Sequence, residues 1–527
     1  MSEYSRMESL YPRGKHGRKS RLRNEKRQEV PVEREEKSSR LSLRESRIHL
    51  PWGIIFGLSA LMAVFSVTNP LLMRFADSLQ SQNLYAGAAM VANHIPYLDF
   101  FGTDGLIFYL LTMLGNFLGS PWLLMGIQFV FTIWSGALFY RIIWFLTYHE
   151  GISRQILLAF YLGLACLGWG GLYASLFALP FVLNGLSFML RYLSGNTRDE
   201  GFILFGLNGA LAFLIDPKSI LLWLMSFVFL TVVNWRWKRK ARGFYQFLAT
   251  ALGFLLIVYL AGYYTVLYQN IGAAIEQTFL YPLTTLGLSL KTSFLPLMIA
   301  AGLVLVTGLL TSLVYGVMAI VASDNKPIPI FLYLLFLTTA ILAVLETPFS
   351  VSNLIPLLPH GLLLTGLYMA STIKVLPSDD DEFTDYTEPK SYVALNGFLP
   401  ILALLYLVAY PAWLWVSQAR VQEERLLVAQ HIAANTGEDE KIYAWDNSAL
   451  VYLESGRWAS AAYITPDTYL VDEDKRSDLN LALGYDRASY VVVNQNQPML
   501  DSFANHLAKS YEEIDLNLHE FKVYRLK

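Results

Sequence analysis

The chain has 527 residues, of which 54% are hydrophobic and only 16% are charged, and its net charge is −2. Soluble proteins carry roughly 25% charged residues, whereas this chain repeats apolar runs of about 20 residues, the pattern of a polytopic α-helical membrane protein. These features exclude a soluble enzyme and an outer-membrane barrel. The single cysteine, Cys166, excludes internal disulfides, zinc–cysteine sites and iron–sulfur clusters. We expect the lipid bilayer as the surroundings and no nucleic-acid partner.

The N-terminal segment, residues 1–50, is strongly basic. It contains 14 Lys or Arg and 8 Asp or Glu, a local net charge of +6. Its low apolar content cannot support a core, so we predict a disordered tail. The excess of Lys and Arg favours a topogenic role that keeps the N-terminus cytoplasmic. Binding to anionic lipid or to an acidic partner is the alternative.

Eleven apolar stretches are predicted to cross the membrane, and the basic residues set their orientation. Five of the fifteen Lys or Arg within 51–417 lie at 236–242, so this loop is expected to be cytoplasmic, as is the tail. An even number of spans must separate them. This holds if Leu106–Leu118, too short for a core of ~30 Å, lies along the outer surface. The predicted spans are 52–73, 121–146, 154–170, 172–193, 201–215, 217–235, 243–268, 296–321, 328–346, 352–373 and 393–416.

This layout predicts three parts: the basic tail 1–50, a transmembrane domain 51–417, and an extracytoplasmic domain 418–527. The transmembrane domain carries two long outer loops, the first loop (74–120) and the second loop (269–295), which are too apolar and aromatic for disorder. The last part changes to a polar composition typical of a small α/β domain. Its predicted strands are 441–445, 449–452, 489–494 and 520–526, and its predicted helices are 419–435 and 499–511.

Three carboxylates in the first loop are candidates for chemistry. Asp77 directly follows the first span, and Asp99 and Asp104 follow a Pro–Tyr turn. A carboxylate at an apolar boundary has a raised pKa unless it is paired, which suits a general base. Helix capping or a place at the water boundary is the simpler interpretation of each one. Their grouping in one loop strengthens the case for a site without displacing that interpretation.

The first loop also carries a family resemblance. Residues 94–109 read HIPYLDFFGTDGLIFY, which resembles a pattern of bacterial membrane glycosyltransferases, roughly Gly-x-x-Pro-Tyr-x-Asp-x-Phe-Asp-x-Lys-Gly-Pro-x-x-Tyr. Those enzymes belong to the GT-C superfamily and are akin to protein O-mannosyltransferases and lipid A aminoarabinose transferases. Asp77-Ser78 is similar to the family's acidic position after span one, and Ser352–Pro359 to its later Leu-Pro-rich segment. The architectural resemblance covers about 50–527.

The sequence also departs from this pattern. Gly102, Asp104 and Leu106 stand where the family has Asp, Lys and Pro, so a basic group for the donor phosphate must come from elsewhere. Lys218, in Asp-Pro-Lys at a helix junction, is one candidate. The segment 169–173 resembles a family segment that commonly carries a Glu, and it has none here. These differences imply a changed substrate or lost activity.

The resemblance implies an inverting transfer of a sugar from a polyprenyl-phosphate donor to a cell-envelope glycan or glycolipid. Asp77 would be the catalytic base, and Asp99 would orient the acceptor or act as the base itself. The remaining substrate-binding candidates are Arg74 and Lys218 for the phosphate, Glu276 and Lys291 for closure over the donor, and His94, Tyr97, Asp104 and Asn353. No cofactor is certain. A divalent metal is compatible with the family, but no ligand spacing indicates one.

Two other classes of protein stay open. A transporter or flippase would carry paired charges, broken helices or repeats within the membrane. A catalytically degenerate GT-C scaffold for envelope polysaccharide assembly would keep the fold and the outer domain. For all three classes we expect a multi-pass protein of the cytoplasmic membrane with the C-terminal domain outside.

Overall fold

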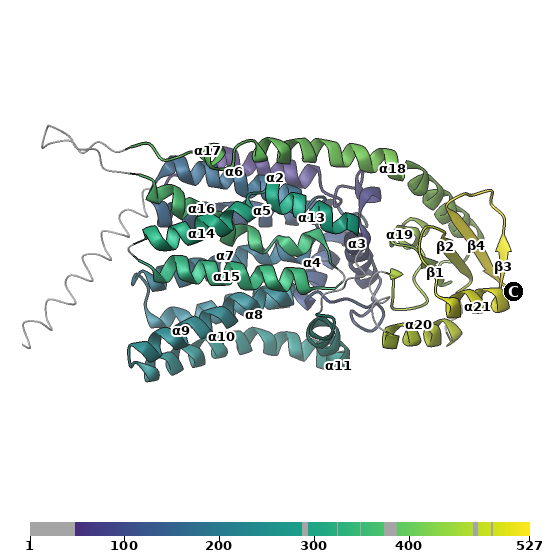
Figure 1. The fold of residues 1–527 in the computed structure, drawn as a ribbon. Helices are drawn as coiled ribbons and strands as arrows, with labels where there is room; N and C mark the ends of the chain where they lie inside the picture. The colour runs from purple at the N-terminus through teal and green to yellow at the C-terminus, as the bar shows by residue number, and fades with distance from the viewer. Residues whose placement is uncertain are drawn as a thin grey trace, which may run out of the picture. The chain divides into compact units, whose positions relative to one another are not determined.

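The computed structural model describes residues 48–286, 294–323, 325–347, 349–373, 387–466, 473–485 and 488–527 (Figure 1). Residues 51–527 form one compact unit. The predictions for Lys291 and for most of the basic tail lie outside the described residues.

Residues 51–417 form a bundle of apolar helices, which confirms the predicted all-α polytopic membrane fold (Figure 1). Within the described residues eight helices are long and apolar enough to cross a membrane, and a bent pair makes a ninth. The eight are α5 (Trp122–Thr147), α6 (Glu150–Leu167), α7 (Ala174–Leu193), α9 (Leu221–Arg236) with η3 (Pro217–Ile220), α10 (Lys240–Leu267), α15 (Pro327–Leu345), α16 (Leu357–Ser371) with η5 (Val351–Leu354), and α18 (Leu399–Asn435).

One predicted span, 52–73, is a much shorter helix in the structure: α2 (Trp52–Val64) has 13 residues. Helix α8 (Phe202–Ile215) has 14 residues and matches the predicted segment 201–215 within one residue. Beyond α2 the Ser66 hydroxyl donates to Gln128 Oε1 at 2.8 Å, so this polar stretch is bonded to other segments rather than continued as helix. Helix α8 ends where Pro217, which has no N–H to donate, follows Asp216.

The predicted span 296–321 is broken into α13 (Phe294–Val306) and α14 (Leu309–Ala322), and its two parts are bent by 48°. The break lies at Gly308, whose φ of +77° falls in the left-handed region that glycine adopts without steric cost. A Cβ at this position would also lie within 2.5 Å of the Tyr392 hydroxyl. The glycine therefore explains a bend that hydropathy alone did not indicate.

Both long loops fold into short helices. The first loop contains η1 (Met73–Phe75), α3 (Ser78–Val91) and α4 (Leu106–Asn116); the last of these matches the predicted short helix, whereas α3 was not predicted. The described part of the second loop contains α11 (Ile271–Ile275), the π-helical turn η4 (Glu276–Leu280) and α12 (Tyr281–Thr284). Two further short elements are η2 (Asp199–Gly201) and α17 (Tyr392–Asn396).

The C-terminal region is an α/β domain built on a four-stranded sheet of order β1-β2-β4-β3. Strand β1 is parallel to β2, and the other neighbours are antiparallel. The strands are β1 (Ile442–Trp445), β2 (Tyr490–Asn494), β3 (Tyr511–Ile514) and β4 (Phe521–Leu526), and the helices are α19 (Leu450–Ser455), α20 (Glu473–Tyr485) and α21 (Asp501–Ser510). The predicted span 393–416 begins in α17, and from Leu399 onward it joins the predicted helix 419–435 in one continuous helix, α18.

The predicted strand at 449–452 is wrong, because this segment opens helix α19. The helix ends at Gly456, whose φ of +65° is the left-handed conformation common just after a helix. A short apolar run has the same pattern in a buried strand and in a buried helix.

A buried ion pair joins α18 to the sheet. Arg425 donates from Nε to Asp446 Oδ2 at 2.7 Å and from Nη2 to Oδ1 at 3.0 Å. The two side chains are only 4% and 0% exposed. Asn494 Nδ2 adds a third donor to Asp446 at 2.7 Å. Removing one partner of such a pair leaves an uncompensated buried charge.

We therefore expect Asp446→Ala to destabilise the C-terminal domain by about 3–5 kcal/mol, because Arg425 would stay buried without its carboxylate. The unfolding midpoint of the full-length protein in detergent measures this loss. The control is Glu513→Ala, which removes a pair with Lys522 whose side chains are 48% and 43% exposed. It should cost less than about 1 kcal/mol. Equal unfolding midpoints for Asp446→Ala and Glu513→Ala would contradict a large contribution of the Arg425–Asp446 pair to stability.

Candidate functional site

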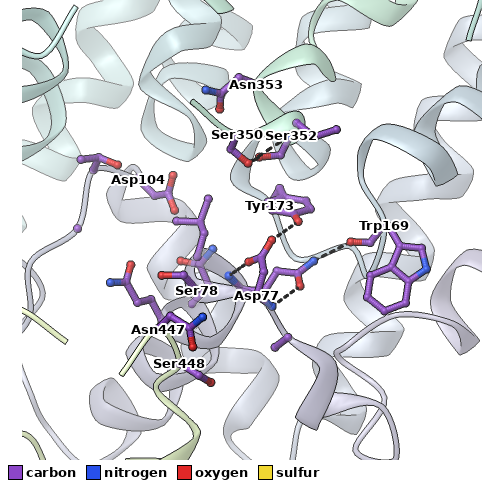
Figure 2. Close-up of a pocket in the computed structure, with 18 of the residues that line it drawn as sticks. Asp77, Ser78, Asp104, Trp169, Tyr173, Ser350, Ser352, Asn353, Asn447 and Ser448 are labelled. Atoms are coloured by element: carbon purple, nitrogen blue, oxygen red, sulfur yellow. Dashed lines mark hydrogen bonds between the residues drawn. The ribbon is translucent and has the colours of Figure 1, made fainter. Parts of the chain in front are cut away.

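A cavity of about 810 Å³ lies where helices of the bundle, the first loop and the C-terminal domain meet. Its lining includes apolar side chains, among them Leu167, Ile299 and Leu414. The lining also includes carboxyl, hydroxyl and amide groups, and Figure 2 shows several of these side chains gathered around the cavity. The cavity therefore offers surfaces for an apolar chain and for a polar group in one space.

Asp77 is fixed at the start of α3 by a reciprocal cap. Its Oδ1 accepts from Gln80 N at 2.8 Å, and its own N–H donates to Gln80 Oε1 at 3.0 Å. The other carboxylate oxygen, Oδ2, accepts from the Tyr173 hydroxyl at 2.6 Å (Figure 2). A capping box of this kind satisfies backbone donors that a helix leaves unpaired. The carboxylate is therefore positioned by the capping bonds with Gln80, three residues away, and by the hydroxyl of the distant Tyr173.

The segment 169–173, which precedes α7, contacts the Asp77–Gln80 cap. Gln80 Nε2 donates to the carbonyl oxygens of Trp169 and Gly171, both at 2.8 Å. Gly170 and Gly171 have φ values of +80° and +66°. A Cβ on Gly171 would collide with the side chain of Gln128. These glycines allow the close approach that places Tyr173 against Asp77.

The Asp77 carboxylate is open to the cavity and is also surrounded by protein. Burial raises its pKa above the ordinary value, while the hydrogen bonds from Gln80 and Tyr173 act in the opposite direction. The result is an accessible carboxylate with a raised pKa. This combination suits a group that takes a proton from a bound hydroxyl.

A second charged cluster lines the cavity at Asp104, Lys218 and Glu346. Lys218 Nζ forms an ion pair with Glu346, and its backbone N–H donates to Asp216 Oδ1 at 3.2 Å. Burial raises the pKa of Asp104 to about 7; the charges of Asp216 and Glu346 act in the same direction, and Lys218 opposes them. The cluster therefore holds more carboxylates than ammonium groups.

The structure brings four of the predicted site residues together at the cavity: Asp77, Asp104, Lys218 and Asn353. Tyr97 lies behind it, only 3% exposed, and donates from its hydroxyl to the Asp104 carbonyl at 3.0 Å. Tyr97 thus supports Asp104 through the backbone rather than facing the cavity.

The other described candidates lie elsewhere. Asp99 accepts from Ile95 N at 2.6 Å within its own turn, and His94 Nδ1 lies 3.5 Å from it. The Arg74 guanidinium lies over the Trp415 ring at 5.2 Å. Glu276 pairs with Lys475 of α20 at 2.5 Å. None of these four candidates from the described chain lines the cavity.

Several cavity residues were not singled out from the sequence. Glu346 is one, and a signal for it existed, because a carboxylate at the end of a span commonly has a charged partner. Tyr173 and Arg425 carried no such signal, since their partners lie 96 and 21 residues away. Within the described residues, no group of three His, Cys, Asp or Glu side chains is arranged to hold a metal ion.

The raised pKa of Asp104 predicts a pH-dependent contribution to stability. The folded protein holds this carboxyl at a pKa of about 7, against an ordinary value of 3.8, so it binds the proton more tightly than the unfolded chain does. The stabilising contribution is complete below about pH 4 and is lost as the pH rises to about 7. Asp104→Asn should remove this dependence. As the pH rises from about 4 to 7, the unfolding midpoint of the variant should therefore rise relative to that of wild type.

The matched control is Asp439→Asn, which changes an exposed carboxylate in the C-terminal domain. Its midpoint should follow the wild-type curve at every pH. A constant difference between Asp104→Asn and wild type from about pH 4 to 7 would refute the raised pKa.

Comparisons with known proteins address the fold and the family. A search among curated proteins finds no match. The chain is similar to crystal structures of ArnT from Cupriavidus metallidurans. For the form bound to undecaprenyl phosphate the TM-score is 0.52 at 14% identity, and for the apo form it is 0.50 at 12%. Each match covers 90% of this chain and 97% of ArnT. At this identity the likeness shows the fold, which is GT-C.

The sequence itself matches a protein family along nearly its whole length. Residues 40–419 match the N-terminal domain, and residues 422–527 the C-terminal domain, of the family described as competence-induced protein Ccs4. The chain therefore belongs to the competence-induced Ccs4 family, and it has the GT-C fold.

Proposed function

We propose that this chain is a membrane glycosyltransferase that moves a sugar from a polyprenyl-phosphate donor to a hydroxyl of a cell-envelope glycan or glycolipid. The observation that carries the proposal is Asp77, a carboxylate with a raised pKa, open to the cavity and fixed by Gln80 and Tyr173. The GT-C fold adds an analogy, because the similar ArnT structure was bound to undecaprenyl phosphate.

In the proposed reaction Asp77 takes the proton from the acceptor hydroxyl. The hydroxyl oxygen forms a bond to the anomeric carbon of the sugar while the bond to the phosphate oxygen breaks, and the electron pair leaves with the polyprenyl phosphate. A single displacement of this kind inverts the anomeric centre. The apolar side chains of Leu167, Ile299 and Leu414 suit the lipid chain, and the polar groups of the lining suit the sugar and acceptor.

Lys218 is the proposed partner of the departing phosphate. The family resemblance expects a lysine where Asp104 stands, and Lys218 lies close enough to Asp104 to influence its pKa. Both residues line the same cavity. A donor phosphate would compete with Glu346 for the Lys218 ammonium group. Charge stabilisation at a leaving group is commonly a large contribution to such catalysis.

A second candidate function is a non-catalytic scaffold of envelope assembly. The specific observation in its favour is that both basic side chains described in the cavity wall, Lys218 and Arg425, already have carboxylate partners. A scaffold would bind a donor lipid or an envelope polymer without consuming it. Measuring turnover therefore separates the two functions.

We expect Asp77→Asn to abolish transfer while the protein stays folded. The amide keeps the shape and the hydrogen-bonding oxygen of the side chain, but it cannot accept a proton as a base does. A loss of roughly 10²–10⁴-fold is typical of a removed general base. The measurement is release of polyprenyl phosphate by purified protein from a panel of polyprenyl-phosphate sugars with acceptor.

Two further variants define the result. Asp501→Asn, on the exposed face of α21 outside the cavity, should keep the wild-type rate. Asp99→Asn tests the other predicted base and should retain far more activity than Asp77→Asn. If Asp77→Asn turns over like wild type, Asp77 is not the base. If wild type binds donors but never releases polyprenyl phosphate, the scaffold is favoured.

Tyr173→Phe should move the acidic limb of the transfer rate to higher pH. The Tyr173 hydroxyl favours the charged form of Asp77, so its loss raises the pKa of the base further. Because the base must be unprotonated, more alkaline conditions are then needed for half-maximal rate. The pH–rate profile measures this, and Tyr511→Phe in the C-terminal domain is the matched control. An unshifted limb would show that the tyrosine does not act through Asp77.

A further inference from the structure

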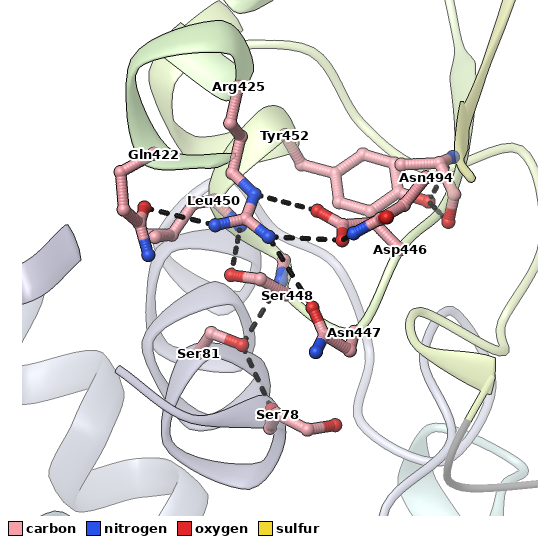
Figure 3. A network of polar contacts seen from close by, with 12 residues as sticks. Ser78, Ser81, Gln422, Arg425, Asp446, Asn447, Ser448, Leu450, Tyr452 and Asn494 are labelled. Atoms are coloured by element: carbon pink, nitrogen blue, oxygen red, sulfur yellow. Dashed lines mark hydrogen bonds and ion pairs between the residues drawn. The ribbon is translucent and has the colours of Figure 1, made fainter. Parts of the chain in front are cut away.

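The C-terminal domain supplies a polar wall of the cavity whose role the proposed reaction leaves unassigned. Gln422 and Arg425 of α18 and Asn447 after β1 all line the cavity, and we call these three residues the amide wall (Figure 3). We propose that the amide wall binds the acceptor, and that the part bound there is an uncharged, hydroxyl-rich glycan. The inference rests on the proposed function only in naming this ligand the acceptor.

Arg425 orients the two amides. Its guanidinium donates from Nη1 to Gln422 Oε1 at 3.0 Å and from Nη2 to Asn447 Oδ1 at 3.4 Å. A guanidinium has only donors, so both side-chain amides must turn their oxygens toward it. Their NH₂ groups then point away from Arg425. Within the described residues neither NH₂ group has a hydrogen-bond partner, and both side chains are partly accessible.

The charge of the amide wall is cancelled locally. Asp446, which is 0% exposed, binds Arg425 through both carboxylate oxygens, so the guanidinium brings no net charge to the cavity. The wall therefore presents hydrogen-bond donors without a positive charge. Such donors bind the oxygen atoms of hydroxyl and ring groups, and they do not compensate the charge of an anion.

The rest of the cavity disfavours an anionic acceptor. Asp77, Glu346 and Asp104, whose carboxyl with a pKa of about 7 is only partly ionised near neutral pH, line the same space. The described lining offers them one cation, Lys218, besides the neutralised Arg425. A carboxylate- or phosphate-bearing acceptor would be repelled by these groups in surroundings where charges are weakly screened. An uncharged glycan is not repelled, and its hydroxyl groups can donate to the carboxylates.

Hydrogen bonds also fix the segment after the amide wall to helix α3, which begins beside the proposed base. The Ala449 N–H, two residues beyond Asn447, donates to Ser81 Oγ of α3 at 3.1 Å. At the start of α3, the hydroxyl oxygens of Ser78 and Thr465 are 3.0 Å apart. Because Asp77 caps this same helix, α3 links the segment that carries Asn447 to the carboxylate. A glycan bound by the wall would present a hydroxyl toward the base.

The test is glycan binding by the full-length protein in detergent without any donor. The probes are labelled neutral oligosaccharides of glucose, galactose and N-acetylglucosamine units, and matched oligosaccharides that carry a uronic acid or a phosphate. We expect at least one neutral probe to bind more tightly than its charged counterpart. Asn447→Leu and Gln422→Met each remove one donor at similar volume and should weaken that binding roughly five-fold or more.

The matched control is Asn480→Leu, which changes a half-buried amide of α20 that donates to the Ser502 hydroxyl and lies outside the cavity lining. This variant should bind the probes like wild type. The unfolding midpoint of each variant checks that the fold is kept. The inference is overturned if no neutral probe binds, if charged probes bind more tightly, or if folded Asn447→Leu and Gln422→Met both bind like wild type.

These outcomes are separate from those of the proposed function. Neutral-glycan binding that depends on the amides, in a protein that never releases polyprenyl phosphate, would refute transfer and support the amide wall. Transfer that survives both amide substitutions with an unchanged KM for the acceptor would support the proposed function and overturn the amide wall.

Discussion

The cavity depends on one requirement: helix α3 must be hydrogen-bonded on two sides at once. On the side of the membrane helices, the amides of Gln80 and Asn83 donate to backbone carbonyls of the segment 169–172. On the side of the C-terminal domain, the hydroxyls of Ser81 and Tyr85 accept from backbone N–H groups. Buried polar groups are costly unless such partners exist. Helix α3 therefore holds the helical bundle and the C-terminal domain together at its N-terminal end, where Asp77 lies.

The later part of the first loop is held from other directions. The side-chain amide of Gln277 donates to the Tyr97 carbonyl at 2.8 Å and accepts from Gly102 N at 3.1 Å. The π-helical turn of the second loop is therefore bonded to both ends of the segment 97–102. Phe101 lies in the hydrophobic core that Trp445 and the sheet form, beside Tyr281 of the second loop. The backbone that carries Asp104 thus depends on both loops and on the C-terminal domain.

Hydropathy was sufficient to predict a bundle of apolar helices and the short helix α4, but it did not predict the early end of α2 or the bend between α13 and α14. The same reasoning could not predict α3, whose buried residues include the consecutive polar side chains Gln80–Asn83, several of which bond to distant backbone groups. It also gave a strand where α19 forms, because a four-residue apolar run suits both.

Some residues of the candidate site could be recognised from the sequence, and others are placed there only by the tertiary structure. Asp77 was recognisable from its place after the first span, but from the sequence Asp99 ranked above Asp104, as a second candidate for the base. Only the tertiary packing decides that Asp104 faces the cavity and that Asp99 bonds within its own turn. The Lys218–Glu346 pair joins residues 128 positions apart, and nothing local to either predicts the other.

The position of Asp104 resolves an apparent conflict in the proposed chemistry. The family resemblance expects a lysine there, and a carboxylate beside a phosphate would be repulsive. With a pKa of about 7, however, this carboxyl is partly protonated near neutral pH, and a protonated carboxyl donates a hydrogen bond. An arriving phosphate would raise that pKa further, since a neighbouring negative charge disfavours ionisation. On the proposed function, donor binding and proton uptake at Asp104 are therefore coupled, and the carboxyl supplies a neutral donor beside the Lys218 ammonium group.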